Sequence, residues 1–180
     1  MGLFDKFQKL AAARRDLAAL GIDPFGVEIE RIISPTEGVI HGRRTILAGT
    51  NNYLGLTFNP ECIAAAHRAL DAEGTGTTGS RMANGSYSGH RRLEEELAAF
   101  YGMRDAIVFS TGYQANLGTL AGLTGANDVV LLDADCHASI YDGCRLAGAE
   151  MIRFRHNNAE DLAKRMLRLG ARAADTLIVV

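Results

Sequence analysis

The sequence predicts an α/β fold: a mainly parallel sheet with helices on both faces. From residue 106 onward, short apolar runs at 106–110, 128–133, 150–154 and 176–180 alternate with helical patterns. The runs are apolar for most of their length rather than at every second position, which is typical of parallel strands covered on both faces. We therefore expect residues 59–180 to form the first part of a large α/β domain.

The first 58 residues have a different character, and we expect them to form a separate segment with a helix and a small β hairpin. Apolar side chains recur on one stripe of the opening helix: Leu3, Phe7, Leu10, Leu17 and Leu20. Charged residues interrupt this stretch, so it is neither a signal peptide nor a membrane span. Packing on the protein itself or on a partner subunit is favoured, with docking on a membrane surface as the alternative.

The remaining elements follow from local signals. The segment DPFG at 23–26 ends the first pattern, residues 27–33 alternate as a strand does, and two apolar runs around HGRR at 41–44 indicate a hairpin. Asn59-Pro60 marks the start of a helix that Gly74 can end in a left-handed conformation. Further helices are expected at 91–102, 113–123, 139–148 and 159–170.

Composition excludes several classes of function. Hydrophobic residues make up 47% of the 180 residues and charged residues 22%, as in ordinary soluble proteins. A net charge of −2 gives no case for a nucleic acid or an anionic membrane as partner. The three cysteines lack CxxC spacing, so we expect reduced thiols in the cytoplasm and no metal site.

The stretch IVFSTGYQANLG at 107–118 is the first candidate site. An apolar run ends on Ser110, Thr111 and Gly112, and a helix begins there. Backbone N–H groups at a helix N-terminus have no partner within the helix and lie at the positive end of its dipole, which suits a phosphate. A simple turn with Ser or Thr as the N-cap is the alternative.

The glycine-rich loop at 74–87 is the second candidate. Its GTGTTG matches a dinucleotide-binding pattern but follows a helix instead of a first strand, so binding of NAD is rejected. Long loops without secondary structure are uncommon in compact domains unless they have a function. We therefore favour a functional loop containing Arg81 over a flexible surface excursion.

Polar residues also mark the end of the run at 128–133. Asp133 and Asp135 close the strand, and His137 stands where the next helix begins. Open α/β sheets bind ligands at the carboxyl ends of their strands, the edge where the 110–112 corner also lies. A helix cap is the alternative for His137. Asn51 and Asn52 taken alone are simple turn formers.

Four segments in the same order and spacing resemble one family: NNYLGL, GTTGSRMANGSYSGH, FSTGYQANLG and DADCHASIYDG. The chain resembles the N-terminal part of an α-oxoamine synthase, a pyridoxal-phosphate enzyme of aminotransferase fold type I. Further stretches, including SPTEGVI and LTFNP, favour the member that condenses L-serine with a long-chain acyl thioester.

The resemblance implies a role for each matching position. The cofactor pyridoxal 5'-phosphate would be bound by Ser110, Thr111, Gly112, Tyr113 and His137. His137 would be the catalytic residue, stacking on the cofactor ring and binding the amino-acid carboxylate. The substrate would lie near Asn51, Asn52, Tyr53, Thr78, Ser80 and Arg81, the last three in a loop at the interface of a homodimer with shared active sites.

The implied reaction is a decarboxylative Claisen condensation to 3-ketosphinganine, the first step of sphingolipid biosynthesis. The acyl donor would be a coenzyme A or carrier-protein thioester. Other family members, which make 8-amino-7-oxononanoate, 2-amino-3-ketobutyrate or 5-aminolevulinate, remain alternatives, as does a non-catalytic paralogous subunit.

The family's Schiff-base lysine and the aspartate that pairs with the cofactor nitrogen match no position here. Lys6, Lys9 and Lys164 are the only lysines, and none lies in a matching motif. We therefore expect this chain to be a fragment that is inactive alone, with activity a property of the full-length protein.

Overall fold

The computed structural model describes residues 2, 4–21 and 26–180, so Leu3 and most of the predicted break at 23–26 lie outside the described residues. The chain divides into two compact units, residues 1–76 and 77–180. This division lies after the helix that starts at Pro60. The predicted domain boundary at residue 58 lies before that helix and stays a prediction. Within the described residues, no helix is long and apolar enough to span a bilayer.

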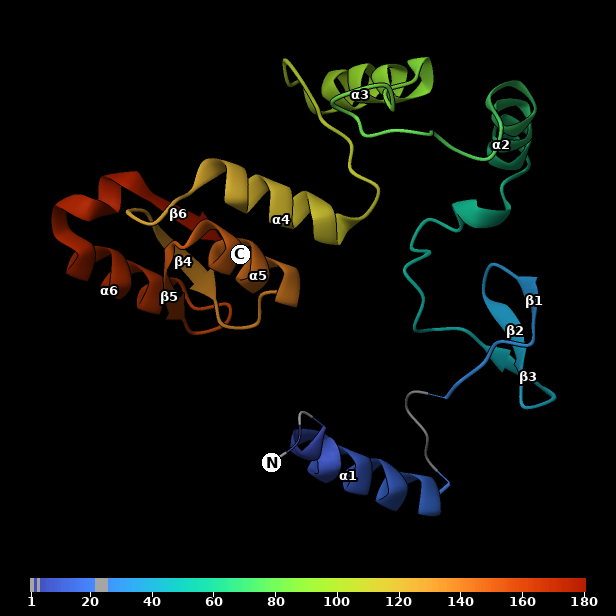
Figure 1. Cartoon of the computed structure of the whole chain (residues 1–180), viewed down its shortest axis with the longest axis horizontal. Coiled ribbons are helices and arrows are strands. Elements are labelled where there is room, and N and C mark those ends of the chain that lie inside the picture. Colours follow the sequence, from blue (N-terminus) through green and yellow to red (C-terminus); the bar gives the residue numbers. More distant parts are fainter. Residues whose placement is uncertain (1, 3, 22–25) are drawn as a thin grey trace. The chain divides into compact units, whose positions relative to one another are not determined.

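The first unit contains the predicted helix and hairpin (Figure 1). A short 3-10 helix, η1 (Asp5–Phe7), precedes α1 (Gln8–Ala19), and an antiparallel sheet follows, in the order β1 (Arg31–Ser34), β2 (Glu37–Ile40) and β3 (Arg43–Ile46). His41 and Gly42 both have positive φ, the mark of a two-residue type I′ turn. The hairpin around HGRR is therefore confirmed.

The 3-10 helix η2 (Leu56–Phe58) and helix α2 (Pro60–Glu73) complete this unit. The Asn59 side chain accepts hydrogen bonds from the backbone of Glu61 and Cys62, so the predicted helix start is confirmed. Gly74 ends α2 with φ 78° but ψ −165°, outside the left-handed helical region. The predicted left-handed cap is wrong because the chain leaves α2 extended, into the glycine-rich loop.

The second unit carries the parallel sheet, ordered β5 (Glu150–Phe154), β4 (Val129–Asp133), β6 (Thr176–Val179). Helix α5 (Ala138–Ala147) links β4 to β5, and α6 (Ala159–Leu169) with the 3-10 helix η3 (Gly170–Asp175) links β5 to β6. The first connection leads from β4 to β5 on one side, and the second leads back past β4 to β6 on the other side. Because the two connections run in opposite directions along the sheet, right-handed crossovers place α5 and α6 on opposite faces (Figure 1). The predicted parallel sheet with helices on both faces is confirmed.

The core of this unit lies between the sheet and the pair α4 (Gly112–Leu123) and α5. All five residues of β4 are buried, and Val130 and Leu132 pack with Leu120 and Cys144. A Cβ at Gly143 would lie 2.9 Å from the Cβ of Leu120, so glycine allows the two helices to approach closely.

The apolar run at 106–110 is not a strand, contrary to the prediction. No ladder partner pairs with it among the described residues. Side chains bind its backbone instead: Glu94 of α3 (Ser88–Tyr101) accepts from the N–H of Val108 at 3.0 Å, and Arg81 donates to the Val108 carbonyl at 3.2 Å. An apolar run predicts burial, but a strand also needs a neighbouring backbone.

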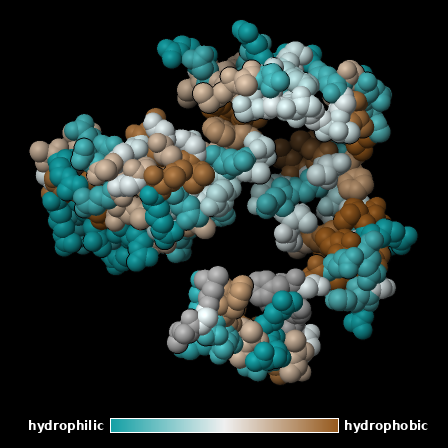
Figure 2. Space-filling view, in the orientation of Figure 1, coloured by the Kyte–Doolittle hydropathy of each residue, from teal (hydrophilic) through white to brown (hydrophobic). Residues whose placement is uncertain are grey.

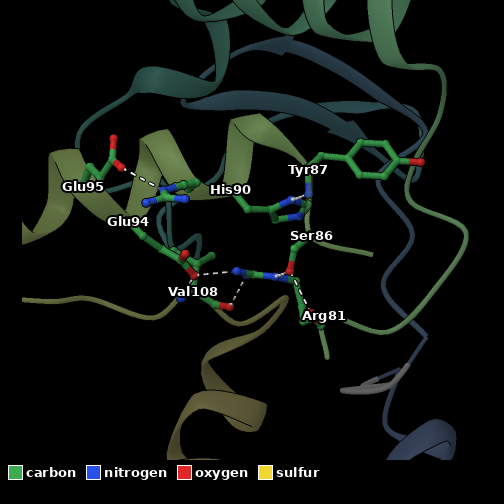
Figure 3. Close-up of polar contacts among 8 residues, drawn as sticks. Arg81, Ser86, Tyr87, His90, Glu94, Glu95 and Val108 are labelled. Atoms are coloured by element: carbon green, nitrogen blue, oxygen red, sulfur yellow. Dashed lines mark hydrogen bonds and ion pairs between the residues drawn. The ribbon is translucent and has the colours of Figure 1, made fainter. Parts of the chain in front are cut away.

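Arg81 and Glu94 also bind each other at 2.8 Å, and we call this arrangement on the Val108 backbone the Arg81–Glu94 clamp (Figure 3). Ser86 accepts from the Arg81 Nε at 2.9 Å and donates to the Arg81 carbonyl. The hydrogen bonds from Val108 and Arg81 lower the pKa of Glu94. The clamp therefore fixes the segment that leads into the 110–112 corner.

We expect Gly143→Ala to lower the free energy of unfolding by about 1–3 kcal/mol, because its methyl group forces α4 and α5 apart. Gly122→Ala is the matched control, since a Cβ there meets nothing within 4 Å. This control should stabilise the protein by up to about 1 kcal/mol through helix propensity. Urea unfolding of the full-length protein measures both, and equal effects would contradict the close packing.

We expect Glu94→Ala to speed hydrogen exchange at the Val108 amide roughly tenfold, because the amide loses its acceptor. Glu95→Ala is the control: Glu95 pairs with Arg91 on the same helix and does not contact Val108 (Figure 3). Exchange measured by NMR or mass spectrometry should be unchanged in that variant. Full protection of Val108 in Glu94→Ala would refute the clamp.

Candidate functional site

The 110–112 corner forms the N-terminus of α4. Thr111 is the extended N-cap, and its hydroxyl accepts from the Gln114 N–H at 3.1 Å, while the Ser110 hydroxyl bonds the Gln114 side chain. Among the described residues, no partner is found for the N–H groups of Gly112 and Tyr113. A Cβ at Gly112 would meet open space. The corner therefore offers two free backbone donors beside a positive helix end, as a phosphate requires.

Helix α5 begins beside this corner, because the first turns of α4 and α5 pack together. Tyr113 donates to the Asp142 carboxylate at 2.6 Å, and Asn116 donates to the Ser139 hydroxyl at 2.9 Å. The hydrogen bond with Asp142 raises the pKa of Tyr113, and the bonds from Tyr113 and Arg145 lower that of Asp142. Two helix N-termini thus lie at the same end of one helix pair.

His137 is the N-cap of α5 and is exposed. Its Nδ1 accepts from the Ser139 N–H at 3.2 Å and lies 2.7 Å from the Ser139 hydroxyl. The cap that the sequence offered as an alternative is therefore present, and it leaves Nε2 free for a ligand. The cavity that contains Ser110 of the corner does not include His137.

A cavity of about 640 Å³ brings the glycine-rich loop and the corner together. Ser80 and Arg81 line it with Ser110 and Gln114, and Leu117 adds an apolar wall. The loop closes on itself through Gly79 and Gly85, where a Cβ would collide with neighbouring loop atoms. Thr78 does not line the cavity. Much of the hydrogen-bonding capacity of Arg81 is used in the clamp.

Asn51, Asn52 and Tyr53 belong to the first unit. Asn52 donates to the Thr57 hydroxyl at 2.9 Å, and Tyr53 donates to the Asn51 side chain at 3.3 Å, so all three have the local contacts of turn formers. Asn51 and Asn52 line a cavity of about 510 Å³, while Tyr53 is exposed. Figure 2 shows apolar residues gathered at the surface around β1–β3.

Asp133 has a structural role that the sequence did not reveal. Its carboxylate accepts from the N–H groups of Asp135 and Asn157 at 2.8 and 3.0 Å, and lies 2.8 Å from His156 Nδ1. These bonds, led by that of Asn157, lower the pKa of Asp133 to about 2, and the bond to Asp133 raises the pKa of His156. Asp133 therefore ties the β4–α5 turn, which ends at His137, to the segment after β5.

Sequence reasoning also missed Glu94, Ser139 and Asn116. A glutamate in a run of three and a serine near a helix start carry no signal of their own, because charged helix faces and capping residues are common. Only the packing of α4 on α5 and of the loop on α3 reveals their partners.

Comparison with known proteins identifies the family. The model of "Aminotransferase class I and II" matches residues 44–180. A serine palmitoyltransferase from Caulobacter vibrioides is 59% identical over all 180 residues, which cover 45% of that protein. An 8-amino-7-oxononanoate synthase from Methylobacterium is 45% identical over 138 residues, covering 77% of this chain and 36% of that protein.

Solved structures agree with this result. Serine palmitoyltransferase of Sphingomonas wittichii has a TM-score of 0.94 and 55% identity, with 99% of this chain and 45% of that chain covered. A serine palmitoyltransferase structure that contains PLP has a TM-score of 0.90 and 54% identity over 94% of this chain and 43% of its own. The chain thus spans less than half the length of these relatives. It belongs to the aminotransferase class I and II family, with the fold type I architecture, and is homologous to the N-terminal part of the α-oxoamine synthases.

Proposed function

We propose that this chain is part of a PLP-dependent acyltransferase that condenses L-serine with a long-chain acyl thioester to 3-ketosphinganine. The observation that carries the proposal is the corner at the start of α4, with two free N–H groups, in a chain so similar to serine palmitoyltransferases. Because the chain covers 45% of its Caulobacter relative, the activity is proposed for the full-length protein.

The corner residues fit the phosphate of pyridoxal 5'-phosphate. Gly112 and Tyr113 would donate their backbone N–H groups to it, and the α4 dipole would favour its negative charge. The hydroxyls of Ser110 and Thr111 already bond Gln114 and hold the corner in shape. When bound, the cofactor supplies an electron sink for the carbanion at the serine α-carbon.

The other predicted residues would handle the amino acid. His137 would stack on the cofactor ring and donate its free Nε2–H to the serine carboxylate. Asn51, Asn52 and Tyr53 would line the substrate side. Ser80 and Arg81, with Thr78, would complete the site from the loop at a homodimer interface. Met82 in that loop is fully exposed, as a residue that contacts a partner subunit would be in an isolated chain.

Synthesis of 8-amino-7-oxononanoate is the second candidate reaction, because such synthases are also relatives of this chain. The lower identity, 45% against 59%, favours serine and a long acyl chain. A non-catalytic subunit is disfavoured, because a pure interaction protein needs neither the open corner nor a histidine with a free Nε2.

We expect the purified full-length protein to form 3-ketosphinganine from L-serine and palmitoyl-CoA, with release of CO2. Product detection by mass spectrometry, with serine, glycine and alanine tested against acyl thioesters of different length, measures this. Turnover of alanine with pimeloyl thioester but not of serine would replace the proposal by the second candidate, and no turnover with any pair would refute both.

We expect Gly112→Pro to weaken PLP binding roughly 10- to 100-fold, because proline removes one N–H donor to a charged group. Proline is tolerated at the first helical position, and Thr111 has the extended conformation that a residue before proline prefers. Fluorescence titration measures the affinity, and circular dichroism checks the fold.

Pyridoxal, which lacks the phosphate, is the control ligand for this variant. Its affinity should be the same in the Gly112→Pro variant and the wild type. An equal loss for both ligands would mean that the substitution disturbs the whole site, and unchanged PLP affinity would place the phosphate elsewhere.

A further inference from the structure

The hydrogen bonds around His137 determine which ring nitrogen carries its proton. The Ser139 backbone N–H lies 3.2 Å from Nδ1, and a backbone N–H can only donate. Nδ1 therefore acts as the acceptor, and in the neutral imidazole the hydrogen is on Nε2. The orientation of the ring and its tautomer are thus linked to residue 139.

The Ser139 hydroxyl reinforces this choice. Ser139 is fully buried in the α4–α5 joint, and its Oγ lies 2.7 Å from Nδ1 of His137. On its other side, the Asn116 side-chain amide donates to the same Oγ at 2.9 Å. The Asn116 amide occupies one lone pair of the hydroxyl, and the hydrogen of the hydroxyl is available for His137, so donation runs from Asn116 through Ser139 to His137.

We infer that Ser139 and Asn116 are positioning residues that hold His137 as the Nε2–H tautomer, with this N–H directed to the carboxylate of the amino-acid substrate. The inference rests on the proposed function for its substrate, whereas the tautomer itself is a property of the chain. The opposite tautomer would present a lone pair to a carboxylate, and two acceptors repel each other.

This arrangement also explains why a buried hydroxyl lies in the helix joint. A buried polar group without a partner is costly, and the α4–α5 interface is otherwise closely packed around Leu120 and Gly143. Ser139 bonds one group on each side, so it is satisfied only while α4, α5 and the His137 ring keep this arrangement. These bonds thereby hold the 110–112 corner on α4 and His137 on α5 in fixed relative positions.

The test uses the full-length protein with ¹⁵N-labelled histidine. Heteronuclear NMR distinguishes the two tautomers, and His137→Gln assigns the signal among the five histidines of this chain and any beyond it. We expect the wild type to show a protonated Nε2 and an unprotonated Nδ1 at His137. Asn116→Asp should shift the population toward the Nδ1–H form, because a carboxylate accepts the Ser139 hydrogen and turns Oγ into an acceptor.

Ser139→Ala is the second variant, and Asp142→Asn is the matched control. Asp142 lies in the same helix joint but bonds Tyr113 and Arg145 instead of His137, so its variant should keep the wild-type tautomer. In Ser139→Ala we expect the affinity for L-serine to fall several-fold, with a smaller change in kcat. The change in cofactor absorbance on addition of L-serine measures this affinity. Restoration of binding by Ser139→Thr, which keeps the hydroxyl, would support positioning.

An Nδ1–H tautomer in the wild type would overturn the inference, as would an unchanged tautomer in Asn116→Asp. Failure of the proposed function gives a different result: the tautomer shifts as expected in Asn116→Asp, but L-serine neither binds nor reacts in the wild type. That result would overturn the assignment of the carboxylate as the target of Nε2–H and leave the role of the two residues in setting the tautomer supported.

Discussion

The second unit depends on the way that Arg81 and Glu94 bind the backbone of Val108. The segment at 106–110 must reach the start of α4 in one defined path, and within the described residues it has no strand beside it. An ion pair supplies one acceptor and one donor to a single residue, as a neighbouring strand would. Because Arg81 comes from the glycine-rich loop and Glu94 from α3, the Arg81–Glu94 clamp holds the loop, α3 and the segment at 106–110 together (Figure 3).

The corner and His137 lie at the N-terminal ends of α4 and α5, which the contacts between these two helices hold together. Tyr113, Asn116 and Leu120 follow one face of α4, and each meets a residue of α5: Asp142, Ser139 and Gly143 in turn. Two of these contacts are polar and one is a close glycine contact, so helix spacing and rotation are both constrained. The helices also pack on the sheet, because β4 is buried along its whole length.

The sequence predicts most of the elements but few of the contacts that position the site. The strand at 128–133, the hairpin around HGRR and the helix start at Asn59 each have a local signature, and all three are confirmed. The prediction of a strand at 106–110 was wrong because hydrophobicity indicates burial and does not indicate hydrogen bonding to a neighbouring strand. The bonds of Asp133 to Asn157 and of Ser139 to Asn116 could not be predicted, because these partners lie 24 and 23 residues away in the chain, beyond any local pattern.

The phosphate that we propose for the corner would be bound by backbone donors and not by basic side chains. Arg81 and Arg145, which are near the corner and the helix joint, are paired with Glu94 and Asp142. A helix N-terminus needs no side-chain ordering when the ligand binds, and its N–H groups do not titrate. The positive potential of the corner therefore does not depend on any side chain that gains or loses a proton.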